Sequence, residues 1–199
     1  MHEIILFAED SSHEQIIGSI LRRLADTLRV PINLKCLNAT GGHGQVLKAL
    51  QRFVKDINRY RALIPPLVVV AIDANCTGFN GRRKQVEEKC QGISFPIAHA
   101  IPDPHVERWL LVDSAAFKAA LGVGCSAPDQ KCERDRYKRA LREAVQKAGV
   151  SPSLGGIEYA DDIVGKMNLT HIPHPDTSLE QFLAPVRQHF RQWAQEEFP

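Results

Sequence analysis

Two short apolar runs that each end in a carboxylate constrain the fold of this chain most strongly. Residues 4–8 read Ile-Ile-Leu-Phe-Ala and lead into Glu9 and Asp10, while residues 68–72 read Val-Val-Val-Ala-Ile and lead into Asp73. Continuous apolar runs of this length are typical of strands buried on both faces of a parallel sheet. Open α/β sheets bind ligands at the edge formed by the carboxyl ends of their strands. The sequence therefore predicts a cluster of acidic side chains at that edge, where a cation would reduce their mutual repulsion.

The pattern up to about residue 113 predicts alternating strands and helices. Strands are expected over residues 3–9, 32–37, 67–72 and 95–100. Apolar residues recur at helical spacing between these runs, and a capping box of Ser11 and Glu14 is expected to begin the first helix. Such alternation predicts a mostly parallel sheet flanked by helices on both faces.

The character of the chain changes after residue 113. Helices are expected near residues 115–121, 133–148 and 178–197, and no run is typical of a strand. We therefore predict an α/β domain over residues 1–113 and a helical extension packed on it over residues 114–199. In the last helix, one apolar stripe is expected either to pack on the α/β core or to remain exposed and dock a partner: Phe182, Val186, Phe190 and Trp193.

Composition limits the class of protein. Hydrophobic residues make up 44% and charged residues 24%, as in ordinary globular proteins, and a net charge of +2 neither requires nor excludes a polyanionic partner. No apolar run approaches the roughly 18 residues that span a bilayer, so we expect no membrane partner. The cysteine usage and the lack of a signal-peptide pattern predict a cytoplasmic protein. Because the cysteines are odd in number and form no CxxC motif, we expect reduced thiols and no zinc site: Cys36, Cys76, Cys90, Cys125 and Cys132.

Three motifs occur in a recognisable order. Glu9 follows the first strand, Asp73-Ala74-Asn75 follows a later strand, and the segment 104–113 carries Glu107 before an aromatic residue and two leucines. This order resembles a TOPRIM domain, the fold shared by topoisomerases, primases and the overcoming-lysogenization-defect nucleases. The third motif resembles that of small TOPRIM-like proteins found beside ATPases in bacterial defence loci.

The resemblance implies a nuclease that uses Mg²⁺ or Mn²⁺ to hydrolyse DNA or RNA. Glu9, Asp73 and Glu107 would be its catalytic acids and metal ligands, with Asn75 as a neutral fourth ligand. Magnesium prefers oxygen ligands and keeps several waters, so one or two carboxylates are enough to bind it. Because the family has an acid where this chain has Asn75, we expect Asn75→Asp to raise metal affinity. We also expect Asp73→Ala to abolish cleavage at little cost in stability, since it removes one of several repelling carboxylates.

The resemblance also implies a partner. Small TOPRIM-like nucleases of this kind are effectors held by an ATPase subunit, so we expect an anti-phage defence complex or self-association. The competing hypothesis is a non-catalytic TOPRIM-like assembly or sensor subunit that lost its metal chemistry with Asn75. A receiver-like or nucleotide-binding α/β domain is a third interpretation, since Glu9 and Asp10 suit a receiver with Asp73 as phosphoacceptor. No GxGxxG or Walker A motif supports autonomous nucleotide binding.

Basic residues supply candidate phosphate contacts. Arg82, Arg83 and Lys84 lie at the start of the helix after Asp73, and Lys166 lies in a later loop. The basic run within 131–142 is consistent both with a surface helix whose neighbouring acids pair with it and with a nucleic-acid contact. His171 and His174 are interpreted as loop residues, with acid–base chemistry as the alternative.

Overall fold

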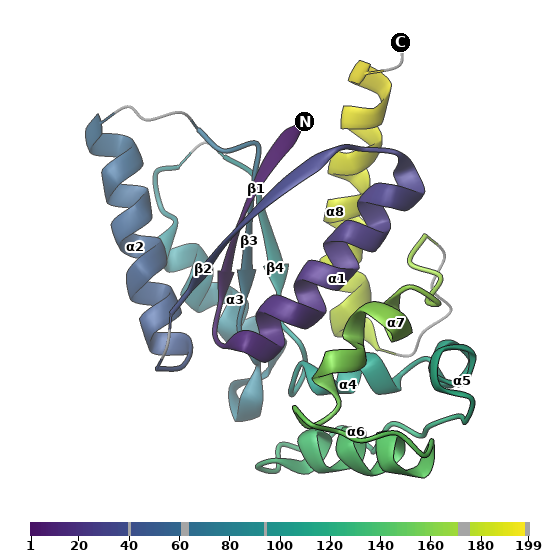
Figure 1. Ribbon diagram of the computed structural model, residues 1–199. Coiled ribbons are helices and arrows are strands. Elements are labelled where there is room, and N and C mark those ends of the chain that lie inside the picture. Colours follow the sequence, from purple (N-terminus) through teal and green to yellow (C-terminus); the bar gives the residue numbers. More distant parts are fainter. Residues whose placement is uncertain (40, 61–63, 94, 171–175, 198–199) are drawn as a thin grey trace.

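The computed structural model describes residues 1–39, 41–60, 64–93, 95–170 and 176–197. Its described strands form one sheet in the order β2-β1-β3-β4, and every neighbouring pair is parallel (Figure 1). The strands are β1 (His2–Ala8), β2 (Ile32–Asn38), β3 (Leu67–Ala71) and β4 (Ile97–Ala100). The predicted α/β fold with a parallel sheet flanked by helices is confirmed.

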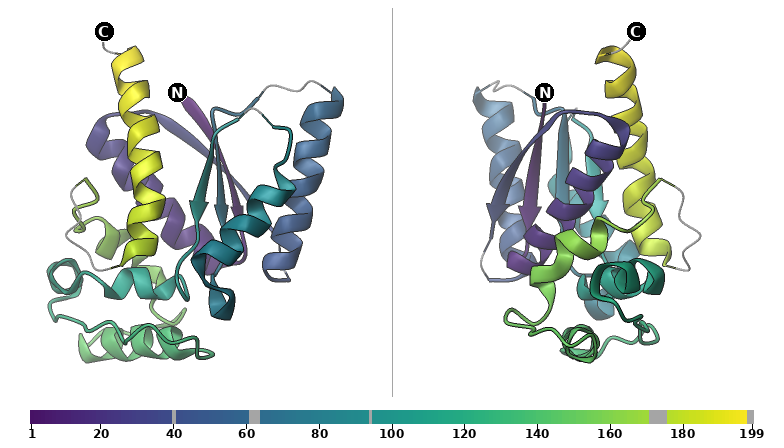
Figure 2. Two further views of the ribbon diagram at one scale, coloured as in Figure 1. Left: turned by 180° about the vertical axis from the view of Figure 1, so that it is seen from behind. Right: turned by 45° about the vertical axis from the view of Figure 1, so that its right-hand side comes forward.

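Helices cover both faces of the sheet. On one face lie α1 (Ser11–Leu28) and α8 (Thr177–Glu197), and on the other lie α2 (His43–Tyr60) and α3 (Gly78–Lys89) (Figures 1 and 2). The chain passes from β1 outward to β2, then crosses back to β3 on the other side of β1. The carboxyl ends of β1 and β3 therefore form the topological switch point, where open sheets bind ligands.

The alternation of side chains along β1 explains why residues 4–8 of this strand are all apolar. Ile4 and Leu6 are buried in the core shared with α1 and α8, while Ile5 and Phe7 are buried in the core shared with α2 and α3. Residues Val68 to Val70 of β3 alternate in the same way. Where a strand is covered on both faces its side chains are apolar, so the acids that follow this buried run lie at the carboxyl edge of the sheet.

The apolar stripe of α8 is buried. Phe182, Val186, Phe190 and Trp193 all belong to the core on the α1 face, where α8 lies against β4. The prediction that this stripe packs on the α/β core is confirmed, and it offers no exposed docking stripe. The core of the α/β part thus includes side chains from the segment that we predicted as an extension.

A buried ion pair fixes the start of α8. The Asp176 carboxylate accepts hydrogen bonds from the backbone N–H groups of Ser178 (3.0 Å) and Leu179 (3.1 Å) and pairs with Arg108. The indole N–H of Trp109 donates to the hydroxyl of Ser178 (3.1 Å). These contacts tie α8 to α4 (Glu107–Leu111).

The remaining helices lie beyond the carboxyl edge of the sheet or beside α1 (Figure 1). They are α5 (Ser114–Leu121), α6 (Arg136–Lys147) and α7 (Ala160–Val164), with short 3₁₀ turns at Asn75–Thr77 and Ile157–Tyr159. Nothing in the described part of residues 114–197 is a strand, as predicted. No helix among the described ranges is long and apolar enough to cross a bilayer.

The predicted capping box is wrong. Asp10, in extended conformation, is the N-cap of α1, and its carboxylate accepts from the backbone N–H of His13 (3.0 Å). Glu14 instead contacts the side-chain amide of Asn38. Asp10 takes the cap because its carboxylate, one residue before the helix, reaches the third helical N–H directly.

Candidate functional site

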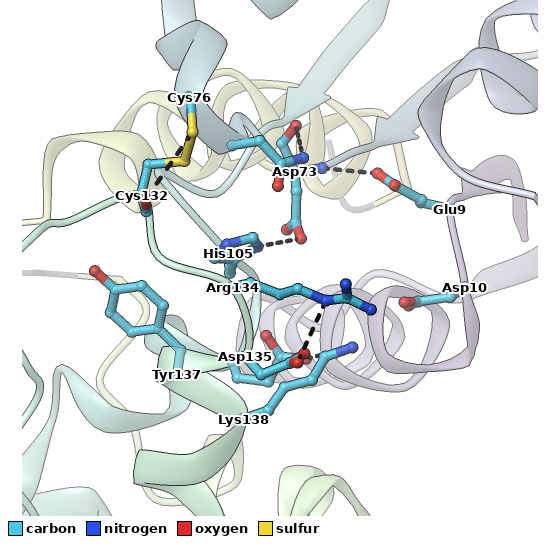
Figure 3. Close-up of a pocket in the computed structure, with 12 residues that line it drawn as sticks. Glu9, Asp10, Asp73, Cys76, His105, Cys132, Arg134, Asp135, Tyr137 and Lys138 are labelled. Atoms are coloured by element: carbon cyan, nitrogen blue, oxygen red, sulfur yellow. Dashed lines mark hydrogen bonds and ion pairs between the residues drawn. A yellow bond between two sulfur atoms is a disulfide. The ribbon is translucent and has the colours of Figure 1, made fainter.

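A cavity of about 340 Å³ lies at the carboxyl ends of β1 and β3 (Figure 3). It is lined by all four predicted metal ligands, Glu9, Asp73, Asn75 and Glu107. The structure thus brings together residues that are up to 98 positions apart in the chain (107 − 9 = 98). Together with Asp10, the carboxylates of Glu9, Asp73 and Glu107 form what we call the acidic wall.

The ends of two neighbouring strands position the first two acids. The backbone N–H of Glu9 donates to the carbonyl of Ala71 at the end of β3 (3.1 Å), which continues the parallel ladder by one residue. The backbone N–H of Asp73 in turn donates to the Glu9 carboxylate (3.1 Å). Glu9 therefore links β1 to the turn after β3, and the hydrogen bond from Asp73 fixes one of its carboxylate oxygens in the acidic wall.

Asp73 is the most fully hydrogen-bonded acid of the cavity. One carboxylate oxygen accepts from His13 Nε2 (3.1 Å) and from the backbone N–H of Val106 (2.9 Å), and the other lies 2.8 Å from His105 Nδ1. Its side chain is 14% exposed. Burial alone would raise the pKa of Asp73, but the neighbouring His13 and the hydrogen bond from His105 lower it. Asp73 is therefore a carboxylate held in one orientation.

His13 is a buried residue between two carboxylates. Its Nδ1 lies 2.8 Å from Asp10, and its Nε2 lies 3.1 Å from Asp73. Burial disfavours the imidazolium, yet the charges of Asp73 and Asp10 raise the pKa of His13 well above its ordinary value. A charged His13 donates to both acids and neutralises part of the acidic wall. Neither His13 nor His105 was predicted from the sequence, in which the local signal was the spacing of three between Asp10 and His13.

Glu107 contrasts with Asp73, because its buried carboxylate is poorly hydrogen-bonded. It is the first residue of α4, is only 2% exposed, and has one carboxylate oxygen, Oε2, that is buried without a hydrogen-bond partner among the described residues. The nearest cation is Lys138, whose Nζ lies 3.9 Å from the other oxygen. Burial, and then the charge of Asp73, raise the pKa of Glu107. An under-satisfied buried carboxylate next to a second one is a place where a cation is favoured.

Asn75 faces the cavity from a turn. Its backbone is left-handed (φ 48°), and its N–H donates to the carbonyl of Pro104 (3.0 Å). The side-chain amide nitrogen lies 3.4 Å from the carbonyl oxygen of Asp73, which leaves the amide oxygen as the atom suited to a metal ligand. Asn75 therefore serves as both the turn residue and a lining residue.

A basic segment before and within α6 lines the other side of the cavity. Arg134 and Lys138, which we call the basic wall, face it together with Tyr137 (Figure 3). The Tyr137 hydroxyl donates to the carbonyl of Asp129 (2.8 Å) and accepts from the backbone N–H of Lys131 (3.0 Å). This buried tyrosine holds the loop before α6 in place.

A disulfide joins the two sides. Cys76, next to Asn75, is bonded to Cys132, with Cα atoms 5.3 Å apart, and both residues line the cavity. The prediction that all five cysteines are reduced is wrong for this pair. The two cysteines are 56 residues apart, so no local motif marks them, and the fold brings the turn after β3 against the loop before α6. Burial raises the pKa of the three free thiols to about 11: Cys36, Cys90 and Cys125.

The predicted phosphate contacts do not line this cavity. Arg82 is buried, and its Nε donates to the carbonyl of Asp73 (3.1 Å), so it supports the backbone of the site. Arg83 pairs with Glu87 (2.8 Å) on the exposed side of α3, where Lys84 is also exposed. Lys166 lines a separate cavity with Arg23 and Thr27. His171 and His174 lie outside the described residues.

The donor set fits a hard divalent cation. It offers carboxylate oxygens, one amide oxygen and the unpartnered Oε2 of Glu107, which are the ligand types that Mg²⁺ prefers. In the described ranges, no three His, Cys, Asp or Glu side chains already form a group that would hold a metal ion. Metal binding would therefore require these side chains to draw together. Comparison with family models, curated proteins and solved structures gives no significant match to this chain.

Proposed function

We propose that this chain is a Mg²⁺- or Mn²⁺-dependent nuclease that hydrolyses phosphodiester bonds. The observation that carries the proposal is the convergence of Glu9, Asp73, Asn75 and Glu107 on one cavity at the switch point of a parallel sheet. The unpartnered oxygen of Glu107 adds to it, because a buried carboxylate of this kind lacks the counter-charge that a metal ion would bring.

Each lining residue has a role in this proposal. Glu9, Asp73 and Glu107 would bind the cation with Asn75 as the neutral ligand. When bound, a divalent cation stabilises charge on the transferring phosphoryl group and lowers the pKa of a bound water. His13, His105 and the N–H of Val106 keep the Asp73 carboxylate oriented, so little reorganisation is needed.

One observation favours a second candidate. Asp73 already accepts three hydrogen bonds, and Asn75 brings no charge, so the site is poorer in free negative charge than an Asp-x-Asp pair would be. A non-catalytic TOPRIM-like assembly or sensor subunit would have these features. In either case the TOPRIM resemblance leads us to propose an ATPase partner in an anti-phage defence complex.

The experiment measures metal binding and cleavage separately. Mg²⁺ and Mn²⁺ binding is followed by calorimetry, and cleavage of plasmid DNA and structured RNA is followed with each metal and with EDTA. The protein is assayed alone and with the proposed ATPase partner, sought among the products of neighbouring genes. Glu107→Gln is compared with Glu88→Gln, which changes an exposed acid of α3 away from the cavity.

We expect metal-dependent cleavage that Glu107→Gln reduces strongly and Glu88→Gln leaves unchanged. Metal binding without cleavage of either substrate, alone or with the ATPase, would favour the non-catalytic subunit. Absence of metal binding would overturn the proposed chemistry.

A further inference from the structure

We propose that Arg134 and Lys138 form the phosphate-binding wall of the cavity and that their ligand is the backbone of single-stranded nucleic acid. This inference rests on the proposed function, because it places the phosphates of the substrate in the same cavity. It differs from the contacts predicted at Arg82, Arg83, Lys84 and Lys166, none of which lines that cavity.

The pairing of the basic residues separates these two from their neighbours. Arg136 pairs with Asp129 and Glu133, and Arg139 pairs with Glu133 (2.9 Å). Acids of the same segment therefore neutralise the charges of these two arginines. The Arg134 side chain is 95% exposed, and among the described residues its ion pair is with the adjacent Asp135, at 3.5 Å, which also lines the cavity.

Lys138 occupies the border between the two walls. Its side chain is 56% exposed, and Nζ lies 3.9 Å from Glu107, which is longer than a hydrogen-bonded ion pair. Lys138 is thus a loose counter-ion of Glu107, and its exposed ammonium can also contact an incoming phosphate.

The basic wall is positioned before any ligand arrives. Cys132 and Tyr137 flank Arg134, one bonded to Cys76 and the other hydrogen-bonded to the loop before α6. In Figure 3, the Arg134 guanidinium extends across the cavity toward Asp10. A segment held at both sides loses less conformational entropy on binding than a free loop, so its cations bind phosphate more tightly.

The size of the cavity selects the form of nucleic acid. A volume of about 340 Å³ is at the small end of ligand pockets and is suited to one nucleotide-sized group. The phosphates of a duplex follow a stiff helical path, whereas a single strand can bend to place one phosphodiester inside such a cavity. Phosphate recognition by arginine and lysine carries no sequence preference by itself, so we expect binding to tolerate sequence changes.

The test measures equilibrium binding rather than activity. Fluorescence anisotropy follows labelled 15-nucleotide oligo-dT and oligo-U, and a 15-base-pair duplex, in EDTA so that no strand is cut. The Arg134→Ala/Lys138→Ala double variant is compared with Arg139→Ala and with Arg83→Ala/Lys84→Ala. A charge-conserving Arg134→Lys/Lys138→Arg variant shows whether the cations or the shape of the segment matter, and thermal unfolding shows that every variant is folded.

We expect the double alanine variant to bind single strands about 30-fold more weakly and to lower the salt slope by about 1.4, which is two single-strand phosphate contacts. The two control variants should stay within about twofold of the wild type, and the charge-conserving variant should keep most of the affinity. A double alanine variant that binds within twofold of the wild type overturns the inference, and so does a duplex bound more tightly than the single strands. Binding without any cleavage would defeat the proposed function alone, whereas cleavage that the double variant leaves unchanged would defeat this inference alone.

Discussion

The two walls of the cavity are built in different ways. The residues of the acidic wall lie at the ends of β1 and β3 and at the start of α4. Its central residue, Asp73, is held by three hydrogen bonds. The basic wall stands on a surface segment that one disulfide and one tyrosine hold against the sheet edge. The topology of the sheet determines where the acids lie, whereas tertiary links between distant segments determine where the bases lie. The two walls should therefore respond differently to substitution.

The largest effect is expected from Asp73→Ala. It should lower cleavage about 10³-fold or more, since it removes a proposed metal ligand. The structure changes our expectation for stability: the variant leaves a buried His13 with one partner fewer, which should cost about 3 kcal/mol rather than little. Urea unfolding and a cleavage assay measure the two effects. A variant as stable as the wild type would contradict the view that His13 and Asp73 form a buried pair.

Removing the disulfide tests the basic wall. The Cys76→Ser/Cys132→Ser variant should lose about 4 kcal/mol of unfolding free energy, as expected for a link that closes a loop of 56 residues. Oligonucleotide binding should weaken severalfold, because the loop before α6 is less constrained. Cys36→Ser is the matched control, since Cys36 is a free thiol on β2. Unchanged stability with and without a reductant would show that the link does not form in solution.

Adding a charge to the acidic wall should strengthen metal binding. Asn75→Asp should raise Mg²⁺ affinity about tenfold, or about 1.4 kcal/mol. The left-handed backbone at position 75 (φ 48°) accepts Asp nearly as well as Asn, so the fold should tolerate the change. Calorimetric titration measures the affinity, with thermal unfolding as the check on folding. A lower affinity would exclude Asn75 from the ligand set.

The smallest effect concerns Glu107, and its size depends on pH. The pKa of Glu107 is raised in the folded protein. As the pH rises above the ordinary pKa of a glutamate, ionisation of Glu107 therefore lowers the free energy of unfolding. Glu107→Gln should therefore stabilise the metal-free protein by about 1 kcal/mol at pH 7.5 and have no such effect near pH 4. Urea unfolding at both pH values measures the difference. A loss of stability at pH 7.5 would mean that Lys138 depends on this carboxylate more than the 3.9 Å separation indicates.

The sequence was sufficient to predict the positions of the site residues that lie at strand ends. Continuous apolar runs identified β1 and β3, and a parallel sheet places whatever follows them at one edge, so Glu9 and Asp73 were predictable. His13 was not, because it lies 60 residues from Asp73 and looks like any polar residue in the first turn of a helix. Asp10 was a candidate for the cap of this helix, but Ser11 and Glu14 match the pattern of a capping box and were favoured over it.

The role of each basic residue also depends on contacts that the sequence does not reveal. Arg82 follows Asp73 closely in sequence and does reach it, but it binds the backbone carbonyl rather than facing a ligand. Arg134 and Lys138 are distant in sequence, and only the packing of α6 beneath the sheet edge brings them to the cavity. Charge runs indicate that a surface is basic, whereas which charges remain available depends on pairing with neighbours such as Glu133.

The packing of α8 also bears on how the protein is made. α8 covers β4, yet it follows every strand of the described residues, so a nascent polypeptide that ends at residue 176 lacks Phe182, Val186 and Phe190, which cover the sheet in the folded protein. At about 5–20 residues per second, the ribosome adds the 21 residues of this helix in roughly one to four seconds. Until then, the apolar face of β4 is open to chaperones and to other nascent chains.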